Sequence, residues 1–201
     1  MSFGRLWNAS AKRFPVFTVS ITNGALSATG NVVAQQFYEK DDENPGYQYM
    51  ETLRFFMYGT CFAPISFRWY GVLSKVFPMK PSTTKFRSYK LGKEGWKTVA
   101  KRVAADQFVF APIAVGTFII SMGVMEGKNL SQIKQNLKDR YIITMLAGYL
   151  LWPAAQAVNF SIIPLIYRVP FTGLTSLIWN TFLSFINNTK PGLKYASQIQ
   201  E

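Results

Sequence analysis

The sequence predicts an all-α integral membrane protein, a helical bundle of four or five transmembrane helices with a short amphipathic helix at its N-terminus. Between Arg140 and Lys190 the chain runs for 49 residues with a single charge, Arg168. A membrane-spanning helix needs about 20 mostly apolar residues, so this run is long enough to cross once and then cross or line the membrane again. The net charge of +12 is concentrated outside such runs, mostly in residues 75–102. We expect the whole chain, residues 1–201, to form a single membrane domain.

The N-terminal region predicts a short amphipathic helix over residues 3–14, with apolar and basic residues on opposite faces. Apolar stretches then predict the spans, which cover residues 16–38, 53–77, 103–125 and 141–167, with a further apolar helix at about residues 170–187. Residues 126–140 predict a short helical connector of mixed charge. Arg168-Val169-Pro170 should interrupt the helix before the last apolar segment, because proline disfavours helical structure at and before its own position. Whether that last helix crosses the membrane is left open.

Polar residues inside the apolar runs are the candidate functional residues, because they cost free energy in lipid unless they face protein or water. The predicted pore lining or polar network consists of Arg54, Arg68, Arg102, Asp106, Gln107, Gln156, Asn159, Arg168 and Asn180. Proline removes a backbone hydrogen bond and clashes with the preceding turn, which predicts helix kinks at Pro112, Pro153 and Pro164.

Asp106 is the most informative of these residues, since a carboxylate within a span faces either a partner or water. Arg102 lies four residues earlier on the same helical face and is one candidate partner. Arg54 and Arg68, on the second span, are alternatives. Two interpretations follow, a structural ion pair between helices and the lining of an aqueous path.

Neither catalysis nor metal binding is predicted. The chain has no histidine and one cysteine, Cys61. This removes the commonest acid–base catalyst and metal ligand, any internal disulfide, and any zinc site built from several cysteines. We therefore predict that the protein is not an enzyme and has no catalytic residue, cofactor or metal ion.

Residues 75–102 carry nine basic residues and one acid, Glu94, and the first 38 residues contain no acid. Two crossings place both basic regions on the same side of a membrane, as the preference of basic loops for one side requires. The basic stretch predicts contact with anionic lipids, or the gathering of anionic solutes at a pore mouth. Nucleic-acid binding is not expected, because no recognised binding module is present. The basic N-terminus also suits a mitochondrial address.

Three motifs carry a resemblance to a known family. The fourth span holds Trp152-Pro153, Gln156, Asn159-Phe160 and Pro164, followed by Trp179-Asn180. The third holds Arg102, Asp106-Gln107 and Pro112, and the second holds Pro64 with Trp69-Tyr70. Together these motifs resemble the Mpv-seventeen and peroxisomal membrane protein family over nearly the whole chain, most closely its fungal, stress-inducible mitochondrial branch. The chain departs from the family pattern at Asn31, where an aspartate is usual, at Glu51, where an arginine is usual, and at Phe67, where a histidine is usual.

The resemblance implies a multi-pass channel or pore of the mitochondrial inner membrane for small polar metabolites. It also implies a role in metabolic homeostasis and mitochondrial DNA maintenance under stress. Two alternatives stay open: a structural or assembly protein that transports nothing and whose polar residues only lock helices together, and a channel of the peroxisomal membrane. A homo-oligomer is compatible with each of these.

Overall fold

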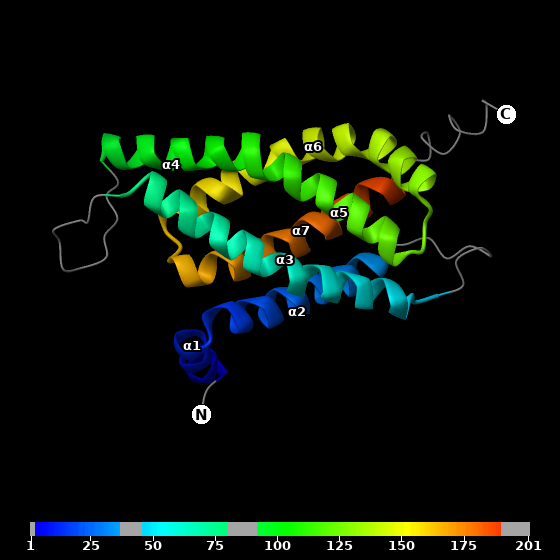
Figure 1. The fold of residues 1–201 in the computed structure, drawn as a ribbon, viewed down its shortest axis with the longest axis horizontal. Helices are drawn as coiled ribbons and strands as arrows, with labels where there is room; N and C mark the ends of the chain where they lie inside the picture. The colour runs from blue at the N-terminus through cyan, green and yellow to red at the C-terminus, as the bar shows by residue number, and fades with distance from the viewer. Residues whose placement is uncertain (1–2, 37–45, 80–91, 190–201) are drawn as a thin grey trace.

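The structure is a computed structural model that describes residues 3–36, 46–79 and 92–189, with side chains as far as Trp179. Every regular element within these ranges is helical, which confirms the all-α class for this part of the chain (Figure 1). The elements are α1 (Phe3–Arg13), α2 (Pro15–Gln35), α3 (Tyr49–Val76), α4 (Lys93–Ala105), the π-helical turn η1 (Asp106–Phe110), α5 (Ala111–Met125), α6 (Leu130–Ser161), the 3-10 turn η2 (Leu165–Tyr167) and α7 (Arg168–Thr189).

Five helical lengths run back and forth along the long axis of the molecule: α2, α3, the continuous helix formed by α4, η1 and α5, then α6 and α7 (Figure 1). Helix α1 lies across one end of this bundle, beside the start of α2. Helix α3 ends and α4 begins at that same end, whereas the turn from α5 to α6 lies at the opposite end (Figure 1). Helix α2 packs against α3 and α7, and α5 packs against α6.

Two of these helical lengths, Lys93–Met125 and Leu130–Ser161, are long and apolar enough to cross a membrane by length and composition. Helices α2, α3 and α7 coincide, within a few residues, with the other apolar stretches that the sequence marked. The number of four or five spans stays a prediction.

The connector expected over residues 126–140 is not a separate helix. Helix α5 ends at Met125 and is followed by Gly127, whose φ of 73° suits glycine. The next amide, of Lys128, bonds back to Gly123 O at 3.0 Å. Helix α6 then begins at once with a capping box, in which Asn129 and Gln132 each accept a hydrogen bond from the other's backbone amide. The connector and the fourth span are therefore one helix of 32 residues.

The interruption between α6 and α7 lies earlier than predicted, at residues 162–167 rather than at residues 168–170. Pro164 has extended backbone angles (φ −60°, ψ 149°) and cannot continue α6. Pro170 instead falls in the first turn of α7, where its missing N–H leaves no helical hydrogen bond unmade. Proline at this position starts a helix rather than ending one.

Helices α2 and α3 approach each other closely through two glycines. A Cβ on Gly59 would lie 2.4 Å from Ser27 Oγ, and a Cβ on Gly24 would lie 2.1 Å from Thr60 Oγ1. Asn23 Nδ2 reaches across the same contact and donates to Gly59 O at 2.9 Å. The two helices can therefore approach this closely because small residues occupy the contact on both of them.

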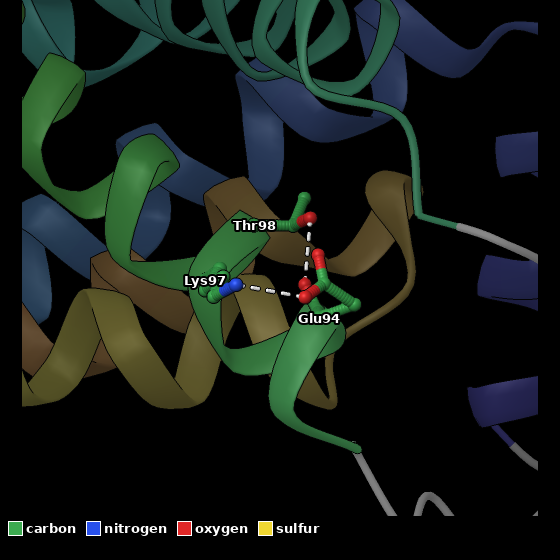
Figure 2. A network of polar contacts seen from close by, with 3 residues as sticks. All are labelled: Glu94, Lys97 and Thr98. Carbon is green, nitrogen blue, oxygen red and sulfur yellow. Dashed lines mark hydrogen bonds and ion pairs between the residues drawn. The ribbon is translucent and has the colours of Figure 1, made fainter.

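The basic helix α4 is exposed along its first turn. Lys97 Nζ lies 2.8 Å from Glu94 Oε1, and Thr98 Oγ1 donates to Glu94 O at 3.0 Å (Figure 2). Pairs this exposed contribute little stability. Glu94, the one acid of the basic stretch, therefore reduces the local positive charge without fixing the helix. Residues 80–91, which carry Lys85, Arg87 and Lys90 of that stretch, lie outside the described residues.

Candidate functional site

The candidate site is built around the π-helical turn η1. Pro112 has no N–H to donate to the carbonyl of Phe108, four residues earlier, and its ring crowds that carbonyl. The helix widens by one residue, so that Ala111 N donates to Asp106 O, five residues back. Such π-turns often occur at functional sites. The distortion predicted at Pro112 thus takes the form of a wider turn, and it carries Asp106 and Gln107, both buried.

Asp106 is 2 % exposed and accepts three hydrogen bonds from neutral side chains. Trp69 Nε1 donates to Oδ1 at 3.0 Å, Gln107 Nε2 donates to Oδ2 at 3.0 Å, and Gln156 Nε2 donates to Oδ2 at 2.8 Å. The expectation of an arginine partner is therefore wrong. Neutral donors from α3, η1 and α6 solvate the carboxylate instead.

Gln156 connects this carboxylate to two further buried groups. Its Nε2 also donates to Tyr70 OH at 3.1 Å, and its Oε1 accepts from Asn159 Nδ2 at 2.7 Å. Asn159 is 0 % exposed, and its Oδ1 has no hydrogen-bond partner in the described part of the chain. The ring of Trp69 stacks on Phe110 with centroids 5.3 Å apart. Three separate helical lengths therefore meet at one buried polar cluster.

Three of the predicted arginines donate hydrogen bonds to backbone carbonyls at or just after the ends of helices. Arg102 donates to Phe77 O from Nε at 3.1 Å and from Nη2 at 2.7 Å. Arg54 Nε donates to Met125 O at 3.1 Å, at the last residue of α5. Arg168 donates to Ile163 O at 3.1 Å and to Ser74 Oγ at 2.8 Å. Carbonyls at helix ends lack an intrahelical donor, so these cations satisfy them and tie neighbouring helices together.

A cavity of about 430 Å³, open over part of its surface, lies between α2, α3, α5, α6 and α7. Its lining along α6 extends from Asn136 to Gln156, about 30 Å of helix at 1.5 Å per residue, which matches the thickness of a bilayer's hydrocarbon core. One end is lined by the cluster around Asp106 and the other by Glu126, Lys128 and Arg140. Aromatic and apolar side chains line the part between, among them Phe55, Tyr58, Phe62, Phe118 and Met122.

The structure divides the predicted site residues into groups. Asp106, Gln107 and Gln156 line the cavity, and Asn159 adjoins them through Gln156. Arg54, Arg102 and Arg168 hold helix ends, and Arg68 is exposed on the outside of α3. Pro153 lies within α6 and Pro164 lies in the break that follows it. The side chain of Asn180 lies outside the described residues.

The sequence analysis gave no role to two pairs of residues at the site. Trp69 and Tyr70 belong to a motif that the resemblance had marked, but no role was assigned to their N–H and O–H groups. Lys128 and Arg140 were assigned to a connector outside the membrane. The tight turn between α5 and α6 places Lys128 at the mouth of the cavity, and the continuation of α6 through the expected connector places Arg140 there.

A second polar cluster joins the end of α2 to the start of α3. Asn31 Nδ2 donates to Glu51 Oε1 at 2.9 Å, and Asn31 Oδ1 accepts from Gln35 Nε2 and from Thr52 Oγ1, each at 2.7 Å. Positions 31 and 51 are two of the departures from the family pattern that the resemblance implied. Asn31 and Glu51 contact each other, so the two departures form one contact between an amide and a carboxylate.

Comparisons with known proteins agree with the resemblance. The Mpv17 / PMP22 family matches residues 123–184. The chain is 38% identical over 192 residues to Protein SYM1 of Eremothecium gossypii, an alignment that covers 94% of this chain and 97% of the relative. It is 33% identical over 189 residues to Protein SYM1 of Saccharomyces cerevisiae, covering 94% and 91%. Against Protein SYM1 of Gibberella zeae the identity is 35% over 188 residues, covering 93% and 98%. No solved structure matches the chain.

Proposed function

This chain belongs to the Mpv17 / PMP22 family and is a membrane protein of that family; from this membership we propose that it forms a multi-pass channel for small polar metabolites in the mitochondrial inner membrane. Its helical lengths then cross four or five times. We include in this proposal the absence of enzymatic activity, and a contribution to metabolic homeostasis and mitochondrial DNA maintenance under stress.

The observation that carries the proposal is the elongated cavity. A conducting path needs polar groups at membrane depth that face water rather than lipid. Asp106, Gln107 and Gln156 line one end of the cavity, and charged side chains line the other, about 30 Å away along α6. A bundle held together only by apolar packing would have no need of a carboxylate in such a cavity.

The aromatic section between the two ends favours a gated path rather than an open one. Phe55, Phe62 and Phe118 line the cavity where few polar side chains line it. Apolar constrictions of this kind stop conduction by excluding water. Opening would require α3 and α5, which carry these rings, to move apart.

A non-transporting structural or assembly protein is the second candidate function. It is supported by Arg54, Arg102 and Arg168, whose hydrogen bonds to backbone carbonyls hold helices together. None of these three side chains lines the cavity described above. Flux of small polar solutes from liposomes that contain the purified protein separates the two candidates. Solute release supports the channel, and tight liposomes that contain folded protein, across voltages and redox conditions, support the structural role.

Asp106 gives the sharper test. An unbalanced negative charge in a path favours cations, so Asp106→Asn should shift permeability toward anions. Reversal potentials in planar bilayers under a salt gradient measure this shift. Asp139→Asn is the matched control, since Asp139 is an exposed carboxylate on α6 that binds Gln135. A folded Asp106→Asn protein with the selectivity of the wild type would remove Asp106 from the path.

Location can be tested separately from conductance. Fractionation of cells that express the tagged chain should recover it with mitochondrial inner membranes, in the pellet after alkaline carbonate treatment. Recovery with peroxisomes would favour the alternative of a peroxisomal membrane channel. Release by carbonate would contradict the spanning topology in either organelle.

A further inference from the structure

The outer face of α3 carries a continuous exposed stripe. Its members recur every three or four residues and so share one face of the helix. The stripe consists of Leu53, Met57, Cys61, Ile65, Arg68, Val72, Lys75 and Val76. Its apolar members are about half exposed or more, for example Ile65 at 53% and Val76 at 61%. An apolar face of this length on a membrane protein suits contact with lipid.

Arg68 interrupts the stripe between Ile65 and Val72. At 1.5 Å per residue it lies about 12 Å from the Val76 end of the helix, well inside an apolar face that must cover about 30 Å of hydrocarbon. It shows no polar partner among the described residues, and it is absent from the lining of the internal cavity. A guanidinium in that position costs free energy unless it meets an anion or water.

Lys75 lies seven residues after Arg68, two turns along the same face. An extended arginine side chain reaches toward the lipid headgroups while its stem stays among acyl chains, and Lys75 stands nearer that boundary. Two cations one above the other, flanked by apolar side chains, complement a phosphate with acyl chains attached.

We propose that Arg68 and Lys75 bind the headgroup phosphate of an anionic phospholipid, with an acyl chain lying along Ile65 and Cys61. The guanidinium offers several donors to the phosphate oxygens, and the ammonium adds a second charge. This site is on the outside of the bundle. It requires that α3 lie in the membrane and is otherwise independent of whether the cavity conducts.

Cys61, the single cysteine of the chain, is exposed and provides the probe. A fluorophore on Cys61 is about 10 Å from Arg68 along the same face. In phosphatidylcholine vesicles, quenching by spin-labelled phosphatidylglycerol should exceed quenching by equally spin-labelled phosphatidylcholine. A basic side chain near the surface enriches anionic lipid about fivefold. The ratio of quenching by phosphatidylglycerol to quenching by phosphatidylcholine should therefore be about five.

The Arg68→Gln, Lys75→Gln double variant should bring the ratio to about one, whereas Arg68→Lys should keep most of it. Lys134→Gln with Lys138→Gln, which removes two exposed charges from α6, is the matched control and should leave the ratio unchanged. Phosphatidylglycerol should also raise the unfolding temperature of the wild type in detergent, and not that of the double variant.

Equal quenching by the two lipids in the wild type would overturn the proposal. Absence of quenching by either lipid, together with disulfide-linked dimers through Cys61 in the unlabelled protein, would show that a second copy covers the stripe and would overturn the proposal as well. Release of free inorganic phosphate from the site on dialysis, without lipid enrichment, would assign the cations to a soluble anion instead.

Discussion

Gln156 Nε2 lies 2.8 Å from Asp106 Oδ2 and donates a hydrogen bond to it across 50 residues of sequence. The same nitrogen reaches Tyr70 OH at 3.1 Å, and the amide oxygen of Gln156 is held by Asn159. One amide therefore joins α3, η1 and α6. Its loss would leave several buried polar groups short of a partner at once, which is costly because such groups have no water to turn to.

Replacing Gln156 by alanine should destabilise the protein by about 3 kcal/mol, the cost of unpairing buried polar groups. Unfolding in detergent, by heat or by denaturing detergent, measures the change. Gln135→Ala is the control, because Gln135 is exposed on the same helix and binds Asp139 alone; it should change stability by less than about 0.5 kcal/mol. Equal effects at the two positions would mean that the buried cluster carries no special stability.

Trp69→Phe should separate the hydrogen bond of the indole from its packing. The variant removes the donor to Asp106 Oδ1 but keeps a ring against Phe110. We expect a loss of about 2 kcal/mol, typical of a hydrogen bond to a charged group. In the Asp106→Asn background the same change should cost less, because the two effects share one contact. Strict additivity in this double-mutant cycle would contradict the bond.

Gly59→Ala should loosen the contact between α2 and α3, because its Cβ would meet Ser27 Oγ at 2.4 Å. Overpacking of this kind costs about 1–3 kcal/mol. Gly71→Ala, on the same helix, meets nothing within 4 Å and should stabilise by about 0.5–1 kcal/mol through helix propensity. Opposite signs for two identical substitutions in α3, read from unfolding temperatures, would verify the close approach. A stabilising Gly59→Ala would refute it.

Orientation can be read from single cysteines in a Cys61→Ser background. Helix α1 and the start of α4 lie at one end of the bundle, and the turn between α5 and α6 lies at the other (Figure 1). Arg5→Cys and Lys97→Cys should therefore react with an impermeant thiol reagent from the same side of sealed vesicles, and Lys128→Cys from the other. Labelling of all three from one side would rule out this transmembrane arrangement.

Much of the fold could be predicted from the sequence, because apolar runs mark helices one by one. The chemistry of the candidate site could be predicted less well. Asp106 was expected to face a partner or water, and its candidate partners were sought among the arginines, since opposite charges are visible in a sequence. The donor from α3 is Trp69, directly beside Arg68. Neighbouring residues point about 100° apart on a helix, so the inward one is known only once the packed face is known.

The same limit explains the two misplaced boundaries. The mixed charge of residues 126–140 indicated a short helical connector separate from the fourth span, yet a capping box at Asn129 starts one helix that runs through both. Pro170 indicated a break, yet proline is as acceptable in a first turn as it is disruptive in a later one. In both cases the local residues were read correctly, and their position within the helix decided the outcome.

The tight turn between α5 and α6 has a consequence for how the protein is made. The bonds at Gly127 and Asn129 satisfy the turn's own backbone groups. Both helical lengths that the turn joins are long and apolar enough to cross a bilayer, by length and composition. This helical hairpin can leave the insertion machinery as a single unit. Helices α2 and α3 are synthesised earlier, but the polar side chains of α2 and the charged residues of α3 make them poorer substrates for insertion. They would insert stably once the hairpin provides a surface to pack against. The order in which the helices enter the bilayer would then depend on how apolar each one is, and not on the order in which they are translated.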